Sequence, residues 1–316
     1  MNIVHLYDKE NNAIAKYVDL LPKQVDDAGM GYPDILHIHG CWHSLATIRT
    51  TALKERRIVI TPHGDLQPWV LSEHKAQQLL ERRQVGRAYT LIAMGPQEAE
   101  GLRQLGWNTR IETVANPLIT KTTSTEQLIA QHLRIYQKVM DSDVLPLLNN
   151  DTRQTLRALL KAGITGDAHW IEGMDIPEPQ WRLLLLYAHQ ADVSDVIERG
   201  LAVIGRKKPN IDTKSIENYQ TRSYRPSTTV DTRSVIQLIK DLQTPTLRRL
   251  VELDKALRQP DVEDDQLLEL IDQQELKQHT ARIMQLLSEQ TAFDEGYMLL
   301  PPLDDKQTES LRRKMQ

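Results

Sequence analysis

Residues 34–41 read Asp-Ile-Leu-His-Ile-His-Gly-Cys, and residues 57–69 read Arg-Ile-Val-Ile-Thr-Pro-His-Gly-Asp-Leu-Gln-Pro-Trp. Each segment is a short apolar run, rich in β-branched residues, that ends in His-Gly, and such a run predicts a buried strand. In open α/β sheets, ligands bind outside the carboxyl ends of the strands. The two His-Gly pairs therefore predict two neighbouring strand ends that face one cleft, with His39 and His63 at the same edge.

Strand-like and helical patterns alternate along the first 119 residues. The predicted strands cover residues 3–7, 35–39, 58–62, 90–93 and 110–114, and the predicted helices cover residues 13–25, 72–88 and 96–105. Alternation of this kind is typical of a parallel sheet covered by helices. The fold class predicted for this part is α/β.

The chain changes character near residue 121. A connector rich in Thr and Ser at 120–125 is followed by apolar residues at helical spacing, with no convincing strand. The expected domains are a Rossmann-like parallel sheet domain at 1–121 and an all-α helical domain at 122–316, the latter divided by a loop at 206–232. The apolar run at 181–187 is too short to span a membrane and suits the centre of a helical bundle.

Composition excludes several classes of partner. The 316 residues carry a net charge of −4, with an isoelectric point near 6.2, so no basic field for nucleic acid is expected. The sequence contains no run of about 18 apolar residues, so no transmembrane segment is predicted. The single cysteine, Cys41, excludes an internal disulfide and a Cys-cluster metal site. Since residues 1–7 also lack the sections of a signal peptide, we expect a cytoplasmic protein, with peripheral attachment at the inner face of the membrane left open.

Four segments of the first half resemble a known family. They cover residues 34–42, 60–69, 88–106 and 111–117, the last two including Gly-Pro-Gln-Glu-Ala-Glu and Val-Ala-Asn-Pro. In order and spacing they are similar to the N-terminal domain of GT-B retaining glycosyltransferases of the type that builds bacterial surface polysaccharides. The resemblance covers residues 1 to about 120. It implies that the first His-Gly faces an acceptor cleft and that the second places His63 near the reacting sugar.

The resemblance supplies a candidate site and a reaction. His63 is the expected catalytic residue, since a strand-end imidazole can hydrogen-bond a sugar hydroxyl and titrates near neutrality. The expected substrate-binding residues are His39, Gly40, Trp42, Gly64, Trp69 and Asn116. The implied reaction transfers a sugar from a nucleotide sugar, the possible donor substrate, to a hydroxyl of a carbohydrate or lipid-linked acceptor.

Two differences from the family pattern concern the binding of the donor nucleotide sugar. Family members have a Gly-rich loop after the first strand, whereas Tyr7 is followed here by Asp-Lys-Glu-Asn-Asn-Ala. A second Rossmann-like domain for the nucleotide sugar is also not recognisable after residue 121. Activity is therefore expected to need a donor-binding partner protein. The alternative is a non-catalytic binding or regulatory protein in which the glycosyltransferase cleft is vestigial.

Each candidate also has a plain structural interpretation. His63 could only cap its turn, and Trp42 and Trp69 are expected to pack in the core rather than stack on a sugar. Four histidines could suggest a metal site, namely His37, His39, His43 and His63, but no carboxylate accompanies them at ligand spacing. No metal and no cofactor are expected. Cys41 lacks the surroundings of a catalytic nucleophile.

Overall fold

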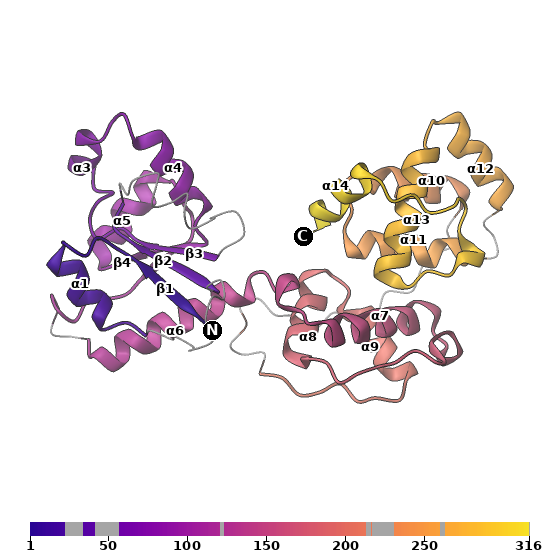
Figure 1. The fold of residues 1–316 in the computed structure, drawn as a ribbon, viewed down its shortest axis with the longest axis horizontal. Helices are drawn as coiled ribbons and strands as arrows, with labels where there is room; N and C mark the ends of the chain where they lie inside the picture. Colours follow the sequence, from indigo (N-terminus) through magenta and orange to yellow (C-terminus); the bar gives the residue numbers. More distant parts are fainter. Residues whose placement is uncertain are drawn as a thin grey trace. The chain divides into compact units, whose positions relative to one another are not determined.

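The chain folds into two compact units, Met1–Asp143 and Val144–Gln316 (Figure 1). The computed structural model describes residues 1–22, 34–41, 57–120, 123–212, 216, 231–259 and 263–315. Strands are found in the first unit, and the described parts of the second unit are helical. An α/β sheet domain followed by a helical region is thus the observed fold class.

The first unit is built on a parallel sheet of five strands in the order β1-β2-β3-β4-β5. The strands are β1 (Ile3–Leu6), β2 (Ile35–His39), β3 (Arg57–Thr61), β4 (Thr90–Ala93) and β5 (Ile111–Thr113). All five predicted strands are confirmed. His39 pairs with Thr61 in the register of β2 and β3, so the two His-Gly pairs follow neighbouring strand ends, as the sequence predicted.

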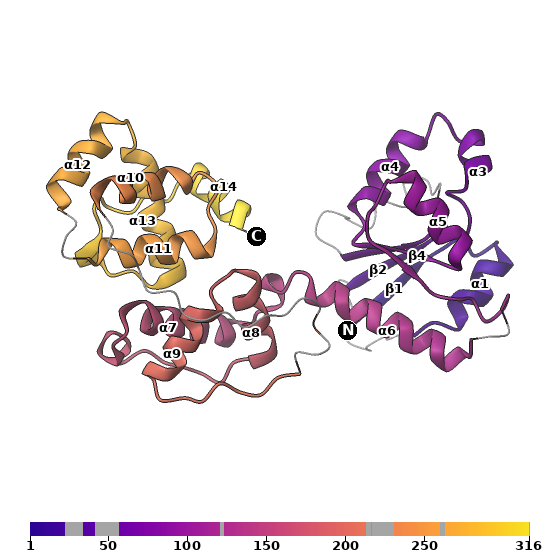
Figure 2. The same ribbon diagram turned by 180° about the vertical axis from the view of Figure 1, so that it is seen from behind.

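Alternate residues of each buried strand pack against different helices. Leu36 and Ile60 lie in a core with residues of α4 (Gln78–Arg87) and α5 (Pro96–Leu105). Ile35 and Val59 lie in a second core with residues of α1 (Asn12–Asp19) and α6 (Thr125–Asp141), and Figure 2 shows α6 running along the sheet. Because side chains alternate along a strand, His37, His39 and Thr61 project to the same face as Ile35 and Val59, toward α1 and α6.

Two helices differ from the prediction. The helix predicted at 13–25 ends at Asp19, because Pro22 lacks the amide hydrogen that would continue it. The helix predicted at 72–88 is divided into α3 (Pro68–Glu73) and α4. Pro68 begins α3 early, and the side chain of Gln78 donates to the carbonyl of Leu71 at 2.6 Å, which closes the turn between the two helices. The helix predicted at 96–105 matches α5.

The first unit extends past the boundary expected at residue 121. Helix α6 begins with a capping box, in which Ser124 and Gln127 bond each other's backbone amides. Its buried residues Leu128, Ile135 and Val139 belong to the core of the sheet. A helix that buries its apolar face on the sheet belongs to the sheet domain, which places the unit boundary at Asp143.

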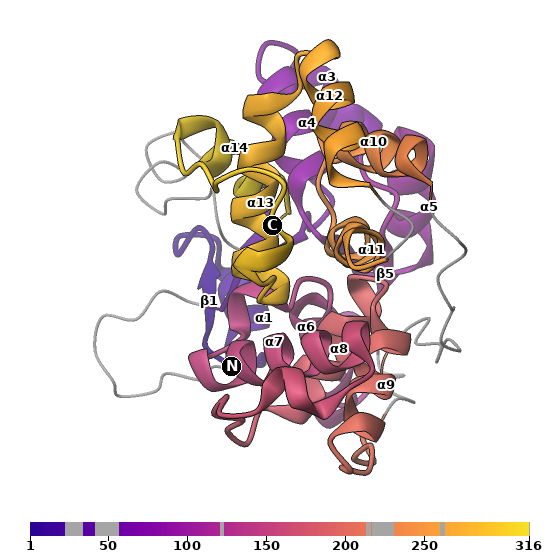
Figure 3. The same cartoon turned by 90° about the vertical axis from the view of Figure 1, so that its right-hand side faces the viewer.

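The second unit is made of helices (Figure 3), and their buried side chains form two cores. The first is built on α7 (Asn150–Thr165), α8 (Trp181–Gln190) and α9 (Ser194–Val203), and the second on α10 (Thr232–Asp241), α11 (Leu247–Leu257), α12 (Asp264–Gln273), α13 (Lys277–Thr291) and α14 (Lys306–Met315). Most of the predicted loop at 206–232 lies outside the described residues. In the described part of the chain, no helix has the length and apolar character needed to cross a membrane.

Glycines allow α7 and α9 to pack with their backbones in contact. A Cβ added at Gly163 would lie 2.0 Å from the carbonyl oxygen of Val196, and one added at Gly200 would lie 2.1 Å from that of Leu159. No side chain fits at either position. The apolar run at 181–187 forms much of α8, and Leu184 and Leu186 are fully buried beside this pair of helices, as predicted.

Candidate active site

The two His-Gly pairs form tight turns at the carboxyl ends of β2 and β3. Gly40 and Gly64 have positive φ angles of 79° and 88°, and His63 itself has a φ of 54°. Left-handed backbone is uncommon for a residue with a side chain and is found mostly where the surroundings impose it. The amide of Gly40 donates to the carbonyl of Thr61 at 2.8 Å, so the first turn is bonded directly to the end of the neighbouring strand.

A row of histidines leads from the sheet to the second turn. Nδ1 of His39 lies 3.1 Å from Nε2 of His63, and Nε2 of His39 lies 3.0 Å from Nδ1 of His5. Nε2 of His5 in turn lies 3.3 Å from the carbonyl oxygen of Pro22. His39 is fully buried, whereas His5 and His63 are partly exposed. The three rings form one connected hydrogen-bonded chain.

Helices α1 and α6 place a second set of polar groups beside this row. His37, fully buried, bonds the hydroxyl of Tyr136 at 2.6 Å and Oγ1 of Thr61 at 2.8 Å. His132 bonds the carbonyl of Leu128 through Nδ1 at 2.9 Å and meets the hydroxyl of Tyr17 through Nε2 at 3.3 Å. Because the carbonyl can only accept, Nδ1 of His132 carries the proton and Tyr17 donates to Nε2.

Burial favours the neutral form of three of these imidazoles, His37, His63 and His132. It lowers the pKa of His63 to about 4 and that of His132 to about 4. The pKa of His37 falls well below its usual value, first through burial and then through neighbouring histidines. Burial also raises the pKa of Tyr17 well above its ordinary value. Near neutral pH, His37, His63 and His132 are therefore uncharged rings, each able both to donate and to accept a hydrogen bond.

A partly buried carboxylate, that of Glu98, organises the ends of β3 and β4. Oε1 of Glu98 accepts from the amide of Gly64 at 2.7 Å, and Oε2 accepts from the amide of Met94 at 2.7 Å. Burial raises the pKa of Glu98 above its usual value, although these two hydrogen bonds act to lower it. Asp65 similarly accepts from the amide of Cys41 at 2.6 Å. The turns after β2, β3 and β4 are thus tied to one another by carboxylates.

Comparison with known proteins gives one match, which falls on this sheet. Residues 21–117 match the glycosyl transferase 4-like domain. The match covers less than a third of the chain and includes β2 to β5 and both His-Gly turns. Searches of curated proteins and of solved structures gave no match. The resemblance seen in the sequence is thus supported at the level of this domain.

Within the matched residues 21–117, the structure brings four of the predicted site residues together. His39, Gly40, His63 and Gly64 lie at two adjacent strand ends. Asn116 follows β5, the edge strand at the other side of the sheet, and its Oδ1 accepts from the amide of Leu118 at 2.9 Å. The side chain of Asn116 is buried and stabilises its own turn.

Of the two tryptophans predicted at the site, the structure describes only Trp69. Trp69 lies in α3 with 67% of its side chain exposed, so the expectation that it packs in the core is wrong. The reason is that α3 is a separate short helix without a buried residue. Trp42 and His43 lie outside the described residues. Cys41 is buried, and burial raises the pKa of its thiol well above the usual value, which opposes a nucleophilic role.

Sequence reasoning missed most of the surroundings of His63. His5, Tyr17, Glu98, His132 and Tyr136 were not among the predicted site residues. His5 could have been found, because it lies two residues after Ile3 on the predicted strand. Its side chain therefore projects to the same face of the sheet as the side chain of Ile3. Tyr17, His132 and Tyr136 carry no local motif, and only the packing of α1 and α6 on the sheet brings them to His37 and His39.

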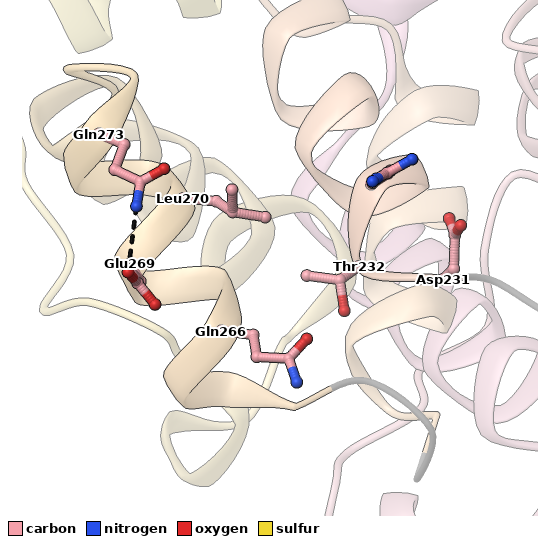
Figure 4. A pocket seen from close by; sticks show the side chains of 7 residues that line it. Asp231, Thr232, Gln266, Glu269, Leu270 and Gln273 are labelled. Carbon is pink, nitrogen blue, oxygen red and sulfur yellow. Dashed lines mark hydrogen bonds between the residues drawn. The ribbon is translucent and has the colours of Figure 1, made fainter.

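A hollow of about 530 Å3 in the helical unit carries no comparable chemistry (Figure 4). It lies between the start of α10 and α12, and its polar side chains serve their own helices. Asp231 caps α10 by accepting from the amide of Ser234 at 2.9 Å, and Glu269 accepts from Gln273 at 3.0 Å. The histidine row in the sheet domain is therefore the candidate active site.

Proposed function

We propose that this chain takes part in glycosyl transfer and supplies the acceptor side of the reaction. The sugar would move from a nucleotide diphosphate sugar to a hydroxyl of a lipid-linked or oligosaccharide acceptor, with retention at the anomeric carbon, in the assembly of a bacterial surface polysaccharide. His63 is the catalytic residue of this proposal. His39 and the two glycine turns position it at the sheet edge.

The observation that carries the proposal is the contact between His39 and His63 inside the matched domain. The rings lie 3.1 Å apart at the carboxyl ends of adjacent parallel strands, where α/β sheets bind ligands. His63 is held there in left-handed backbone, a conformation that costs about 1 to 3 kcal/mol for a residue with a side chain. Such a cost favours a role in binding or chemistry over a role in packing.

The donor is proposed to come with a partner protein. The turn after β1, Asp8-Lys9-Glu10, has a net negative charge, which disfavours a diphosphate. Asn11 occupies the amides of Ala13 and Ile14 at the start of α1. These are the backbone donors that would otherwise bind phosphate at a helix N-terminus. The described part of the second unit offers helices in place of a second nucleotide-binding sheet.

The test is incorporation of a labelled sugar by membranes of the source cells. Membranes from cells that lack the chain should incorporate less label from nucleotide sugars into lipid or polysaccharide, and added wild-type chain should restore it. The His63→Ala variant should not restore it, whereas the control His169→Ala, altered at an exposed histidine of the helical unit, should. Equal incorporation with and without the chain would count against glycosyl transfer.

The alternative function is a non-catalytic binding or regulatory protein. The absence of a strand from the described part of residues 144–316 favours it, since a complete transferase must also bind its donor. In that case the chain would bind an oligosaccharide acceptor without changing its turnover. Equilibrium binding to acceptor oligosaccharides combined with no effect in the incorporation assay would identify this function.

We propose a cytoplasmic location with peripheral attachment to the inner face of the membrane. Helix α4 exposes Leu79 and Leu80, at 78% and 51%, on a helix that also carries Arg82 and Arg83. Exposed leucines beside arginines suit an anionic lipid surface. Sedimentation with vesicles that contain anionic lipid tests this: wild-type chain should co-sediment and the double variant Leu79→Glu, Leu80→Glu should not. Failure of the wild-type chain to co-sediment would refute the attachment.

A further inference from the structure

The hydrogen bonds in the row of His5, His39 and His63 all run in one donor-to-acceptor direction, which is set by His5. The carbonyl oxygen of Pro22 can only accept, so Nε2 of His5 carries the proton in that 3.3 Å bond. A neutral imidazole has one N–H, which makes Nδ1 of His5 the acceptor for Nε2–H of His39. By the same rule, Nδ1 of His39 accepts from Nε2–H of His63.

The end of the row is therefore an unprotonated nitrogen. With its proton on Nε2, His63 presents a lone pair at Nδ1, and no group among the described residues bonds this atom. His63 lies at the carboxyl edge of the sheet and is partly exposed. The fixed carbonyl of Pro22 thus sets, through two intervening rings, which nitrogen of His63 can act as a base.

We propose that His5, His39 and His63 form a directed proton relay that deprotonates the acceptor hydroxyl, an inference that rests on the proposed function for its substrate. The hydroxyl proton bonds to Nδ1 of His63, whose Nε2 proton moves to Nδ1 of His39. The Nε2 proton of His39 moves to Nδ1 of His5, which becomes an imidazolium. The acceptor oxygen keeps its electron pair and bonds to the anomeric carbon on the face from which the nucleoside diphosphate leaves, as the proposed retention requires, and the nucleoside diphosphate takes the electron pair of the old bond.

The surroundings favour moving the proton along the row. Burial disfavours a positive charge on His63, as its lowered pKa indicates. At the far end, Nε2 of His5 bonds the carbonyl oxygen of Pro22, and a hydrogen bond to an acceptor stabilises a charged imidazolium there. Polar rings face the row from the neighbouring elements. They are Tyr7 after β1, Tyr17 on α1 and His37 on β2. Behind them, His132 on α6 contacts Tyr17 and His37. Among the described residues, two carboxylates lie at this edge: Glu98 is bonded to the amides of Gly64 and Met94, and Asp65 is bonded to the amide of Cys41.

A metal site is the competing use of the same rings. Ligand nitrogens of His5, His37 and His39 all lie within 4.8 Å of one another. Both nitrogens of His37 are engaged by Tyr136 and Thr61, however, and His5 and His39 bond each other. A metal ion would have to break the row and displace one of these hydroxyls. The observed bonds favour the relay.

The experiment is nitrogen-15 NMR of the full chain with labelled histidines, which reads the protonated nitrogen of each ring without any enzymatic assay. Near pH 7.5, His5, His39 and His63 should each carry the proton on Nε2. His132 provides an internal reference for the other neutral form of the ring, since its bond to the carbonyl of Leu128 requires the proton on Nδ1. On acidification His5 should become the imidazolium while His39 and His63 change together from Nε2–H to Nδ1–H. Backbone spectra at each pH show whether the fold is intact.

Two substitutions at His5 separate the direction of the hydrogen bonds from the transfer of protons along them. The amide of His5→Gln can donate to Pro22 and accept from His39, so His63 should keep its proton on Nε2 at pH 7.5 but the joint change on acidification should disappear. In His5→Phe the row has no anchor, and His63 should show a mixture of both N–H forms. His169→Phe, altered at an exposed ring, should behave as wild type.

Three results would overturn the relay. They are a proton on Nδ1 of His63 at pH 7.5, an imidazolium at His63 while His39 keeps its form, and tight binding of zinc added alone with shifts of His5, His37 and His39. If the NMR results are as expected but membranes with and without the chain incorporate equal amounts of label, the row exists and the proposed glycosyl transfer is wrong. If His63→Ala restores sugar incorporation, the chain takes part in transfer but the row does not deprotonate the acceptor. The two proposals can therefore fail separately.

Discussion

Nδ1 of His39 lies 3.1 Å from Nε2 of His63, although 24 residues separate them in the chain. The contact arises because β2 and β3 are adjacent and parallel and each ends in a glycine turn with positive φ. It converts two short sequence motifs into one chemical unit. The histidine that sequence reasoning selected is therefore the terminal member of a chain rather than an isolated side chain.

Replacing His63 by alanine should abolish most transfer activity and leave the fold intact. A positioned acid or base contributes roughly a hundred- to ten-thousand-fold in rate, and a partly exposed turn residue contributes little core volume. Initial rates of sugar incorporation and far-ultraviolet circular dichroism would measure the two effects. Unchanged rates would remove His63 from the mechanism, and loss of the fold would make it a structural residue.

The sheet was predictable because its signals are local. A short apolar run predicts a strand whatever surrounds it, and the residues that follow the runs, His39 and His63, must then lie at one edge of a parallel sheet. The polar shell was not predictable in this way. His132 and Tyr136 reach the sheet only because α6 packs on it, and a helix of ordinary amphipathic pattern does not state which surface it will cover.

The helical unit shows the same limit. The spacing of Leu156, Leu159 and Leu160 predicted a helix, and α7 contains all three. The close approach of α7 and α9 depends instead on Gly163 and Gly200, and a glycine inside a helical pattern is ambiguous in a sequence, since it costs stability in a helix. The contact of Val196 with Gly163, which only the structure shows, explains why residue 163 is a glycine.

Isolated full-length chain should not bind nucleotide sugars with a micromolar dissociation constant. Asn11 already bonds the amides at the start of α1, and the preceding turn is acidic. Isothermal titration with a panel of uridine, guanosine and cytidine diphosphate or monophosphate sugars would measure the affinity. Micromolar binding by any of them would contradict the need for a donor-binding partner and would point to an undetected phosphate site.

Replacing Gly163 by alanine should destabilise the helical unit. The added Cβ would lie 2.0 Å from the carbonyl oxygen of Val196, so α7 and α9 must separate, and overpacking of this kind costs about 1 to 3 kcal/mol. Urea unfolding followed by circular dichroism would measure it. The matched control is Gly296→Ala, where the Cβ meets no atom within 4 Å. Equal midpoints for the two variants would show that the helices adjust freely.

An ion-pair network provides a test of pH dependence in the helical unit. Asp294 bonds Nζ of Lys161 at 2.6 Å and a guanidinium nitrogen of Arg258 at 3.0 Å. Partial burial acts to raise the pKa of Asp294, but the hydrogen bonds from Lys161 and Arg258 prevail and lower it below its ordinary value. Arg258 also lies over the ring of Tyr297, 4.8 Å from its centroid.

Replacing Asp294 by asparagine should therefore destabilise the unit near pH 7 and have less effect in acid. A carboxyl group whose pKa is lowered by folding contributes stability that is present above its unfolded pKa, near 3.9, and is lost as the pH falls through the lower folded value. The loss near pH 7 should be about 1 to 3 kcal/mol, the cost of removing charged hydrogen bonds. Urea unfolding at pH 7, 5 and 3 would show the difference between variant and wild type shrinking only at the last pH.

The control for this measurement is Asp272→Asn. Asp272 pairs with Lys277 at 2.7 Å, but both side chains are largely exposed, and such surface pairs are worth about 0 to 1 kcal/mol. Comparing each variant with wild type at the same pH limits the contribution of Asp254, whose pKa burial raises and whose effect on stability has the opposite sign. A pH-independent difference for Asp294→Asn would mean that the carboxylate charge does not stabilise the contact between α7 and the segment after α13.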